Sequence, residues 1–392
     1  MEKKKTSFIQ GAAVLGAAGI LVKIIGAAFR IPLANAIGLI GTSYYDTAYP
    51  YYSWLLVIST SGLPTAISKM VSERVTLGDY RGAHRVFTTA LQILLGIGVI
   101  TALLMFFGAD YLAKLHLLPE VAYSFRALAP ALFFVALMCA YRGYLQGMQQ
   151  MAPTALSQVV EQVGKLVIGL GLAILLLPKG PEYAAMGALI GVTASELLAL
   201  FYIILAYRRR WPRIRSRMER SRRTEDKPVA KRLLALALPI TIGASISPLA
   251  SVVDSALIIR ILLKLGYEKE TAQTAFSLMR TNVATLTNMP GVLTMALAMS
   301  LVPAISAFMA KRDKAGMQSI ARMGLKLALI IGLPCAVGLY ILAGPVLSML
   351  YPKLSPAELQ LATDLMHTSA IGVIFLSLVQ SMTGVIQGMG KP

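Results

Sequence analysis

Lys23 and Arg30 are two cations in an otherwise apolar segment that reads KIIGAAFRIPLANAIG at positions 23–38. Seven residues make nearly two turns of α-helix, so a helix would place both on one face. A lone cation at the centre of a bilayer costs about 2.5–3.5 kcal/mol on insertion scales. The spacing therefore predicts that both face water, a partner or an anionic ligand. The alternative is that they snorkel towards opposite membrane surfaces.

Other polar side chains in the apolar segments are sparse. Arg280 and Asn282 complete the predicted substrate-binding set with Lys23 and Arg30. Cations outnumber acids among these residues, which favours an anionic substrate over a cationic one.

Four further residues are candidates for gating or ion coupling, and each has a plain structural alternative. They are Asp46, Asp254, Glu161 and Lys165. Glu161 and Lys165 have the spacing of an i,i+4 ion pair and are most simply a self-neutralising structural pair. Asp46 lies in the aromatic run YYDTAYPYYSW, typical of a membrane interface, where it is an ordinary loop acid or a gate residue.

Two more arginines and one acid belong to the same analysis. Arg126 and Arg142 lie near the ends of the fourth apolar segment, where interface anchoring is the default expectation. Glu196 lies in the sixth segment and is as compatible with a structural as with a functional role.

Signatures of an enzyme are absent from the sequence. The three histidines are scattered, and the chain lacks H-E-x-x-H, G-x-S-x-G and the lysine of a phosphate-cradling loop. The two cysteines lie in separate apolar segments without metal-like spacing. We therefore expect no enzymatic activity, no cofactor, no metal and no ATP site.

Composition defines the elements that must position these residues. The 392-residue chain is 56% hydrophobic and only 14% charged, with a mean hydropathy of +0.68. A soluble protein of this size cannot bury so much apolar surface in one core. Apolar segments of about 20 residues recur, which is the length that crosses a bilayer. The prediction is an all-α, polytopic membrane bundle.

Hydropathy predicts ten membrane-spanning helices, with boundaries uncertain by several residues. They lie near 9–37, 48–68, 87–110, 121–146, 157–177, 184–206, 233–263, 272–308, 324–346 and 360–388. The connections after the second, sixth and eighth spans are basic, which places the N-terminus in the cytoplasm. The most basic connection, from Tyr207 to Arg232, has twelve Lys or Arg against three acids. We interpret it as a cytoplasmic loop near anionic lipid headgroups rather than a nucleic-acid site.

An internal repeat divides the chain. Ala-Ile-Ser at 66–68 recurs at 304–306, and Gln-Gly-Met at 146–148 recurs at 387–389. Matches in the same order predict two homologous, parallel lobes. We assign 1–207 to an N-terminal lobe of six helices, 208–232 to a basic cytoplasmic linker and 233–392 to a C-terminal lobe of four.

The second lobe reaches its Gln-Gly-Met after four helices and has no counterpart for the last two of the first lobe. We expect it to be incomplete, either because the chain is a fragment or because the gene is truncated. Completion of the bundle by dimerisation is a less favoured alternative.

Three stretches resemble a known family. RIPLANAIGLIGTSYYDTAYPYYSWLLVISTSGLPTAISKMVSE at 30–73, YRGYLQGMQQMAPTALSQVVEQ at 141–162 and MPGVLTMALAMSLVPAISAFMAKRD at 289–313 are similar to the stage V sporulation protein B group. That group is related to the MurJ lipid II flippases of the multidrug/oligosaccharidyl-lipid/polysaccharide (MOP) exporter superfamily. The resemblance implies two six-helix lobes around a central cavity, to which MurJ adds two C-terminal helices.

The resemblance also implies roles for individual residues. Lys23 and Arg30 correspond to the basic pair on the first MurJ helix, and Asp46 falls within one residue of its acid between the first two helices. Two positions depart from the MurJ pattern. The second-helix arginine falls in WLLVIST, which has no cation, and the eighth-helix arginine falls on Thr285, five residues after Arg280.

These observations predict a flippase for a polyprenyl-pyrophosphate-linked saccharide, such as lipid II or a related cell-wall, polysaccharide or spore precursor. Cations would neutralise the pyrophosphate in the cavity while the lobes alternate access across the cytoplasmic membrane. Expected partners are this lipid and membrane lipids, with H⁺, Na⁺ or the membrane potential as the driving force and no nucleic acid. The alternatives are a MATE-type drug/cation antiporter, a membrane-bound transferase and a non-transporting scaffold.

Overall fold

The computed structural model describes the backbone of residues 2–221, 228–310 and 312–389. It also describes the side chains in these ranges, except those of residues 2–16, 20, 23, 27, 296, 303, 307 and 310. Every regular element in this described part is helical. The predicted polytopic helical bundle is thereby confirmed.

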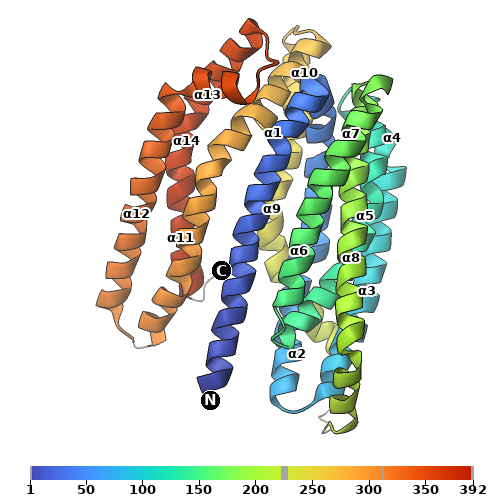
Figure 1. Cartoon of the computed structure of the whole chain (residues 1–392), viewed down its shortest axis with the longest axis vertical. Coiled ribbons are helices and arrows are strands. Elements are labelled where there is room, and N and C mark those ends of the chain that lie inside the picture. Colours follow the sequence, from blue (N-terminus) through green and yellow to red (C-terminus); the bar gives the residue numbers. More distant parts are fainter. Residues whose placement is uncertain (1, 222–227, 311, 390–392) are drawn as a thin grey trace. The chain divides into compact units, whose positions relative to one another are not determined.

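The helices of the first part of the chain run in the following order (Figure 1). They are α1 (Glu2–Thr60), α2 (Gly62–Thr76), α3 (Tyr80–Phe107), α4 (Ala109–Leu115), α5 (Val121–Gly147), α6 (Ala152–Gly164), the π-helix η1 (Lys165–Gly169), α7 (Leu170–Leu176), the 3₁₀ turn η2 (Leu177–Lys179), α8 (Pro181–Glu219) and α9 (Val229–Lys264).

The later helices are α10 (Lys269–Ser277), the π-helix η3 (Leu278–Val283), α11 (Ala284–Ala310), α12 (Lys314–Ile341), α13 (Ala343–Leu350) and α14 (Pro356–Gly388). Nine helical runs of the described residues are long and apolar enough to cross a membrane. The first of these, from Ala17 to Thr76, covers the first predicted span from residue 17 onwards and all of the second.

Gly38 marks the boundary between those two spans. It has φ 70° and ψ −178° inside the continuous run α1, a conformation that only glycine adopts readily. The aromatic run around Asp46 follows this break as helix, so the prediction that Asp46 lies in a loop is wrong. Small and apolar residues flank Gly38 on both sides. The helix therefore resumes after Gly38 within the same membrane-spanning run.

The predicted basic linker is helical over its first half, because α8 continues to Glu219. Ile214 is 2% exposed and belongs to the apolar core of its unit. Arg81 donates from Nε to the Met218 carbonyl at 2.9 Å, which holds this extension against the start of α3. The helix continues because a buried side chain and a docking contact outweigh the repulsion among its arginines. Residues 222–227 of the linker lie outside the described part.

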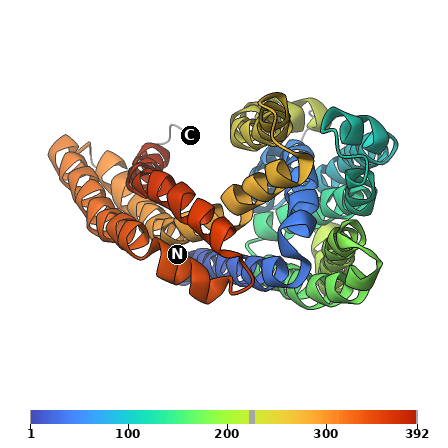
Figure 2. The same cartoon turned by 90° about the horizontal axis from the view of Figure 1, so that it is seen from above.

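The chain forms two compact units. Unit 1 contains residues 1–25 and 40–269, and unit 2 contains 26–39 and 270–392. In unit 1, α5 packs against α3 and α8, and α9 packs against α2. In unit 2, α11, α12 and α14 pack side by side (Figures 1 and 2). These contact-defined units differ from the predicted lobes at residues 26–39 and at α9, and the lobes, which rest on sequence repetition, stay a prediction.

Each unit has two glycines four residues apart on one helix, and these glycines let a second helix approach closely. In unit 1, a Cβ on Gly147 would lie 2.6 Å from Val71 Cβ and 2.8 Å from the Ser68 carbonyl oxygen. In unit 2, a Cβ on Gly388 would lie 2.7 Å from Ile305 Cβ and 2.9 Å from the Val302 carbonyl oxygen. Only glycine permits such close approach, a common device in membrane helix pairs.

The two helix pairs are not in the same register. Gly147 and Gly388 correspond in the sequence repeat, yet Gly388 contacts the equivalents of Pro64 and Ile67, which in unit 1 are contacted by Gly143. The shift is four residues, or about one helical turn.

Candidate functional site

The first helix carries the pair from which the sequence argument started. The backbone is helical through both Lys23 and Arg30, as predicted. Arg30 is half-buried, and the side chain of Lys23 lies outside the described part. The orientation of the pair towards a water-filled passage therefore stays a prediction.

A buried polar stretch follows the Gly38 break. Asp46 is 3% exposed, and its neighbours Thr42, Ser43 and Thr47 are at most 1% exposed. The Thr47 hydroxyl donates to the Ser43 carbonyl at 2.8 Å. This stretch places a carboxylate within the folded core of unit 1, where a gate role for Asp46 remains a prediction.

Four charged side chains form a buried network in unit 1. Lys165 Nζ lies 2.7 Å from Glu161 Oε1 and 3.0 Å from Glu196 Oε1. Arg142 Nη2 lies 3.2 Å from Glu161 Oε2. The predicted Glu161–Lys165 pair is confirmed as an ion pair, but it is one part of a network of two cations and two carboxylates. Three helical segments supply its members, namely α5, the α6–η1 run and α8.

Glu196 is the most deeply buried member, with its side chain 2% exposed. Tyr52 donates its hydroxyl to Glu196 Oε1 at 3.3 Å. Glu196 Oε2 is buried and has no hydrogen-bond partner among the described residues. A carboxylate oxygen with unused acceptor capacity is able to receive a proton or a hydrogen bond from an incoming group.

Close glycine contacts make the network geometrically feasible. A Cβ on Gly164 would lie 2.7 Å from Ser195 Cβ, and one on Gly191 would lie 2.2 Å from Gly169 Cα. These contacts draw the α6–η1 run against α8, so that Lys165 reaches Glu196. Lys165 is also the first residue of η1, and π-segments inside helices occur frequently at functional sites.

The two arginines of α5 have different surroundings. Arg126 forms an exposed ion pair with Asp110 at 2.6 Å, which agrees with the expected anchoring near a helix end. The default expectation of interface anchoring is wrong for Arg142, whose side chain is 12% exposed within the network. Its partner Glu161 lies nineteen residues away on another helix, so no local spacing indicated the pair.

In unit 2 the predicted substrate residues lie on a second π-segment. Arg280 and Asn282 both belong to η3. Asn282 is 1% exposed, and its Oδ1 has no hydrogen-bond partner among the described residues. Arg280 is half-buried, and no carboxylate of the described residues pairs with it. Both residues therefore lie on one irregular helical segment, and their shared role in substrate binding stays a prediction.

Asp254 belongs neither to the ion-pair network of unit 1 nor to the residues of η3. It lies on α9 and is exposed, and it is not a member of the unit 1 network. Among the described residues, no three His, Cys, Asp or Glu side chains gather in a group that could hold a metal ion.

Two cations outside the predicted site residues also lie in a membrane-spanning helix. Arg322 and Lys326 are both inside α12, whereas the predicted span at 324–346 contains Lys326 alone and leaves Arg322 in the preceding basic loop. The pattern Asp313-x-x-Gly316 could have marked the true start, because Asp313 caps α12 by accepting a hydrogen bond from the Gly316 amide at 2.9 Å.

Two solved structures show the class of fold. An inward-facing multidrug resistance MATE family transporter of the MOP superfamily aligns over 97% of this chain and 85% of its own, with a TM-score of 0.76 and 15% identity. The lipid II flippase MurJ in an inward closed conformation aligns over 96% of this chain and 76% of its own, with a TM-score of 0.71 and 14% identity. The chain is thus a multi-pass helical membrane protein with the fold of MOP-superfamily transporters.

Sequence comparison shows the family. The family model for polysaccharide biosynthesis proteins matches residues 8–309, and a MatE model matches 281–392. The chain therefore belongs to the polysaccharide biosynthesis protein family.

Two curated relatives come from Bacillus subtilis strain 168. Stage V sporulation protein B is 29% identical over 349 residues, covering 88% of this chain and 67% of its own. Lipid II flippase MurJ is 25% identical over 405 residues, covering 98% of this chain and 73% of its own. The predicted resemblance to the stage V sporulation protein B and MurJ group is confirmed.

Proposed function

We propose that the protein is a transporter, not an enzyme, and that it flips a polyprenyl-pyrophosphate-linked saccharide across the cytoplasmic membrane by alternating access. Lipid II and related cell-wall, polysaccharide or spore precursors are the candidate substrates. The names of the two curated relatives and the family description support this class.

The observation that carries the proposal is the uncompensated cation Arg280. It lies within a membrane-spanning run, half-buried, and has no carboxylate partner among the described residues. Leaving a cation in this state is costly unless an anion or water reaches it. A guanidinium binds a phosphate oxygen pair through two parallel hydrogen bonds, so a pyrophosphate headgroup suits Arg280.

Asn282 supplies a second kind of contact. Its Oδ1 is a buried acceptor without a partner among the described residues, and leaving such a group unpaired costs about 1–3 kcal/mol. A hydroxyl or amide of the saccharide would satisfy it.

The antiporter alternative requires carboxylates that can accept a cationic drug. In unit 1, Glu161 and Glu196 are already paired with Lys165, and Glu161 is also paired with Arg142. A network that is neutral overall offers a cationic drug little electrostatic attraction. Proton or Na⁺ coupling, or use of the membrane potential, remains the proposed driving force.

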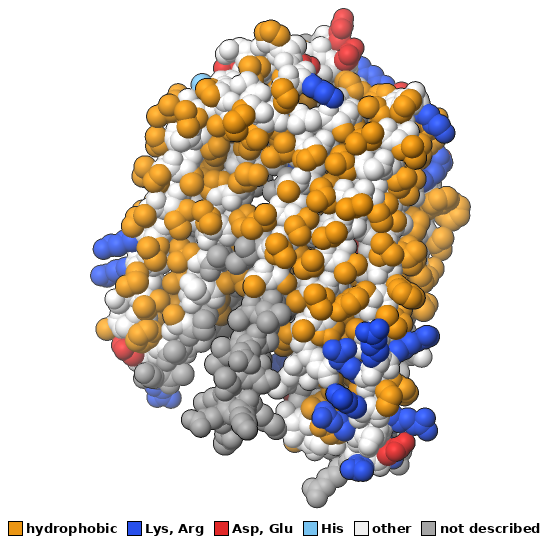
Figure 3. Space-filling model, viewed as in Figure 1, with side chains coloured by type: hydrophobic (Ala, Val, Ile, Leu, Met, Phe, Trp, Pro, Cys, Tyr) orange, Lys and Arg blue, Asp and Glu red, His pale blue; other side chains and the backbone are white. Residues whose placement is uncertain are grey.

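The charge distribution supports an orientation. In unit 1 the α2–α3 turn, the end of α8 and the start of α9 meet, with Arg232 paired to Glu73 at 2.7 Å and Arg81 bound to the Met218 carbonyl. Lys and Arg side chains gather at this end, whereas apolar side chains cover the middle of the visible face (Figure 3). We assign this end, and with it the N-terminus, to the cytoplasm.

The test is complementation in cells depleted of their own lipid II flippase. Wild-type protein should restore growth and the export of lipid II, and Arg280→Gln, Lys23→Ala and Arg30→Ala should each abolish rescue at equal expression. Arg126→Gln, which removes a cation from an exposed pair, is the matched control and should rescue fully. Rescue by Arg280→Gln would overturn the site. Acid-dependent export of cationic dyes without rescue would favour the antiporter.

A further inference from the structure

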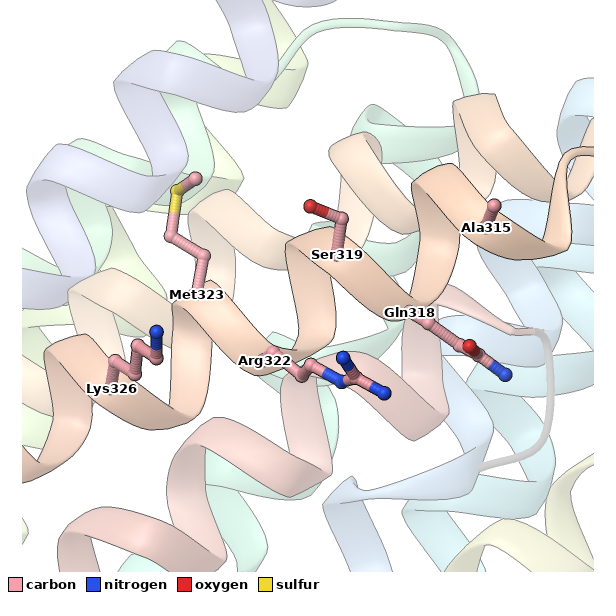
Figure 4. Close-up of a pocket in the computed structure, with 6 residues that line it drawn as sticks. All are labelled: Ala315, Gln318, Ser319, Arg322, Met323 and Lys326. Carbon is pink, nitrogen blue, oxygen red and sulfur yellow. The ribbon is translucent and has the colours of Figure 1, made fainter.

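One face of α12 lines a pocket of about 440 Å³ that is separate from η3. Every side chain that the structure assigns to it comes from this one helix (Figure 4). The lining residues are Ala315, Gln318, Ser319, Arg322, Met323 and Lys326. All six are exposed, so the hollow is open on its outer side.

The opposite face of α12 packs inside unit 2. Its buried residues are Gly324, Ala328, Gly332 and Ala336, a stripe of small residues four apart. A Cβ on Gly332 would lie 2.7 Å from Ser377 Oγ on α14. At about 100° per residue, Arg322 and Lys326 point away from this stripe, so packing within unit 2 does not cover them.

The two cations lie deep along the helix. α12 begins at Lys314, capped by Asp313, so Arg322 is eight residues and Lys326 twelve residues into it. At 1.5 Å per residue these positions are about 12 and 18 Å from the start of α12. Snorkelling can serve Arg322, but Lys326 is more than three turns from the helix start.

Neither cation has a neutralising partner in the part of the chain that the structure describes. Among the described residues, no carboxylate forms an ion pair with Arg322 or Lys326. Both side chains are exposed. The side chains of Arg322 and Gln318 extend in the same direction from the helix (Figure 4). Two adjacent cations flanked by an amide and a hydroxyl form a set of donors suited to phosphate oxygens.

The same face becomes apolar immediately beyond Lys326. Ile330, Leu333, Val337 and Ile341 follow at helical spacing and are 46% to 68% exposed. The face is therefore basic along its first half and apolar along its second. A basic half followed by an apolar half matches a phosphorylated lipid, which has an anionic head and a long hydrocarbon tail.

We propose that this face of α12 is a binding site for the phosphate or pyrophosphate head of an isoprenoid lipid. Arg322 and Lys326 bind the phosphate oxygens, Gln318 and Ser319 add hydrogen bonds, and the apolar half of the face contacts the isoprenoid chain. The site is additional to Arg280 and Asn282. The inference rests on the proposed function for the identity of the lipid.

The test measures binding by purified protein in phosphatidylcholine nanodiscs doped with undecaprenyl pyrophosphate, by native mass spectrometry. Arg322→Gln and Lys326→Gln should each weaken binding by about tenfold, the usual size of a charge-assisted hydrogen bond. Lys314→Gln, a cation of the same helix outside the pocket, should bind like wild type. The charge-preserving Arg322→Lys/Lys326→Arg double variant should retain most of the binding and guards against misfolding.

Three results would overturn the inference. The first is unchanged binding by the Arg322→Gln/Lys326→Gln double variant. The second is equal displacement of the lipid by phosphatidylglycerol at the same mole fraction, which would indicate a general anionic-lipid surface. The third is an affinity for inorganic pyrophosphate as high as for the lipid, which would assign the site to free phosphate.

Binding and transport can fail separately. If wild-type protein neither rescues depleted cells nor exports lipid II, but Arg322 and Lys326 still control lipid binding, the proposed function fails and the α12 site stands. If Arg280→Gln abolishes rescue while the α12 variants bind normally, the α12 site fails and the proposed function stands.

Discussion

Two sets of intramembrane charges, one in each compact unit, differ in whether carboxylates neutralise the cations. In unit 1, Arg142 and Lys165 are paired with Glu161 and Glu196, and all four side chains are at most 15% exposed. In the helices of unit 2, Arg280, Arg322 and Lys326 have no carboxylate partner among the described residues. The same residue types therefore have different roles, and pairing distinguishes them.

The main role of a buried ion-pair network is to hold the fold together. Its ions repay their desolvation through mutual attraction, so loss of one member leaves an uncompensated charge in a medium of low dielectric constant. An unpaired cation makes no internal ion pair that its loss would break, so we expect its replacement to have little effect on folding. The comparison therefore predicts stability defects for changes in unit 1 and binding or transport defects for changes in unit 2.

The largest expected effect is that of Lys165→Met. It would leave Glu196 without its cation and destabilise the protein by about 3–5 kcal/mol. Arg280→Met in unit 2 should change stability by less than about 1 kcal/mol, because it breaks no internal pair. Titration with sodium dodecyl sulfate in mixed micelles measures both. Equal losses for the two variants would show that Arg280 also has a structural role.

A second expectation concerns His116, in the turn after α4 of unit 1. Its Nε2 lies 2.9 Å from the Tyr51 hydroxyl, and burial lowers its pKa from 6.5 to about 4. The folded protein favours the neutral form of His116, so protonation of this side chain favours unfolding. The free energy of unfolding is therefore unaffected by His116 above pH 6.5 and falls as the pH drops from 6.5 to 4. The loss should reach about 3 kcal/mol.

Unfolding measured at a series of pH values checks this slope, and His116→Gln should flatten it. A variant with the same slope as wild type would assign the acid sensitivity to other groups. His367→Gln, at a histidine of unit 2, provides the comparison and should leave the slope in place.

The glycine-mediated helix pairs provide a comparison in which the two units should agree. Gly147→Ala and Gly388→Ala each place a Cβ under 3.0 Å from a neighbouring backbone oxygen and side chain. Each should lower stability by about 1–3 kcal/mol. Gly372→Ala on α14, where a Cβ meets nothing within 4 Å, should instead stabilise by about 0.5–1 kcal/mol. A loss confined to one unit would show that the one-turn register shift has made the pairs unequal.

The smallest effect should come from the exposed ion pair between Arg126 and Asp110, whose side chains are 39% and 62% exposed. Asp110→Asn should change stability by about 0–1 kcal/mol, and the change should shrink further at high salt. A loss approaching that of Lys165→Met would contradict the view that burial, and not pairing alone, makes the unit 1 network strong.

Local patterns in the sequence predicted much of the fold. Apolar segments of membrane-spanning length located the helices, because such segments must satisfy their backbone hydrogen bonds internally. The i,i+4 spacing predicted the Glu161–Lys165 pair, because neighbouring turns of one helix fix that geometry. Helix boundaries were less certain. The stretches beyond Tyr207 and before residue 324 are rich in Lys and Arg, so hydropathy ended the predicted spans there and the extra turns of α8 and α12 were missed.

Only the tertiary structure could show which distant residues meet. Arg142, Glu161 and Glu196 lie on three different helices, and the Lys165–Glu196 contact depends on glycines that let the α6–η1 run approach α8 closely. The sequence by itself determined a multi-pass helical bundle with scarce interior charges, since hydropathy and helical period are local properties. The tertiary structure decided which of those charges are neutralised, since pairing depends on distances between helices that no local pattern encodes.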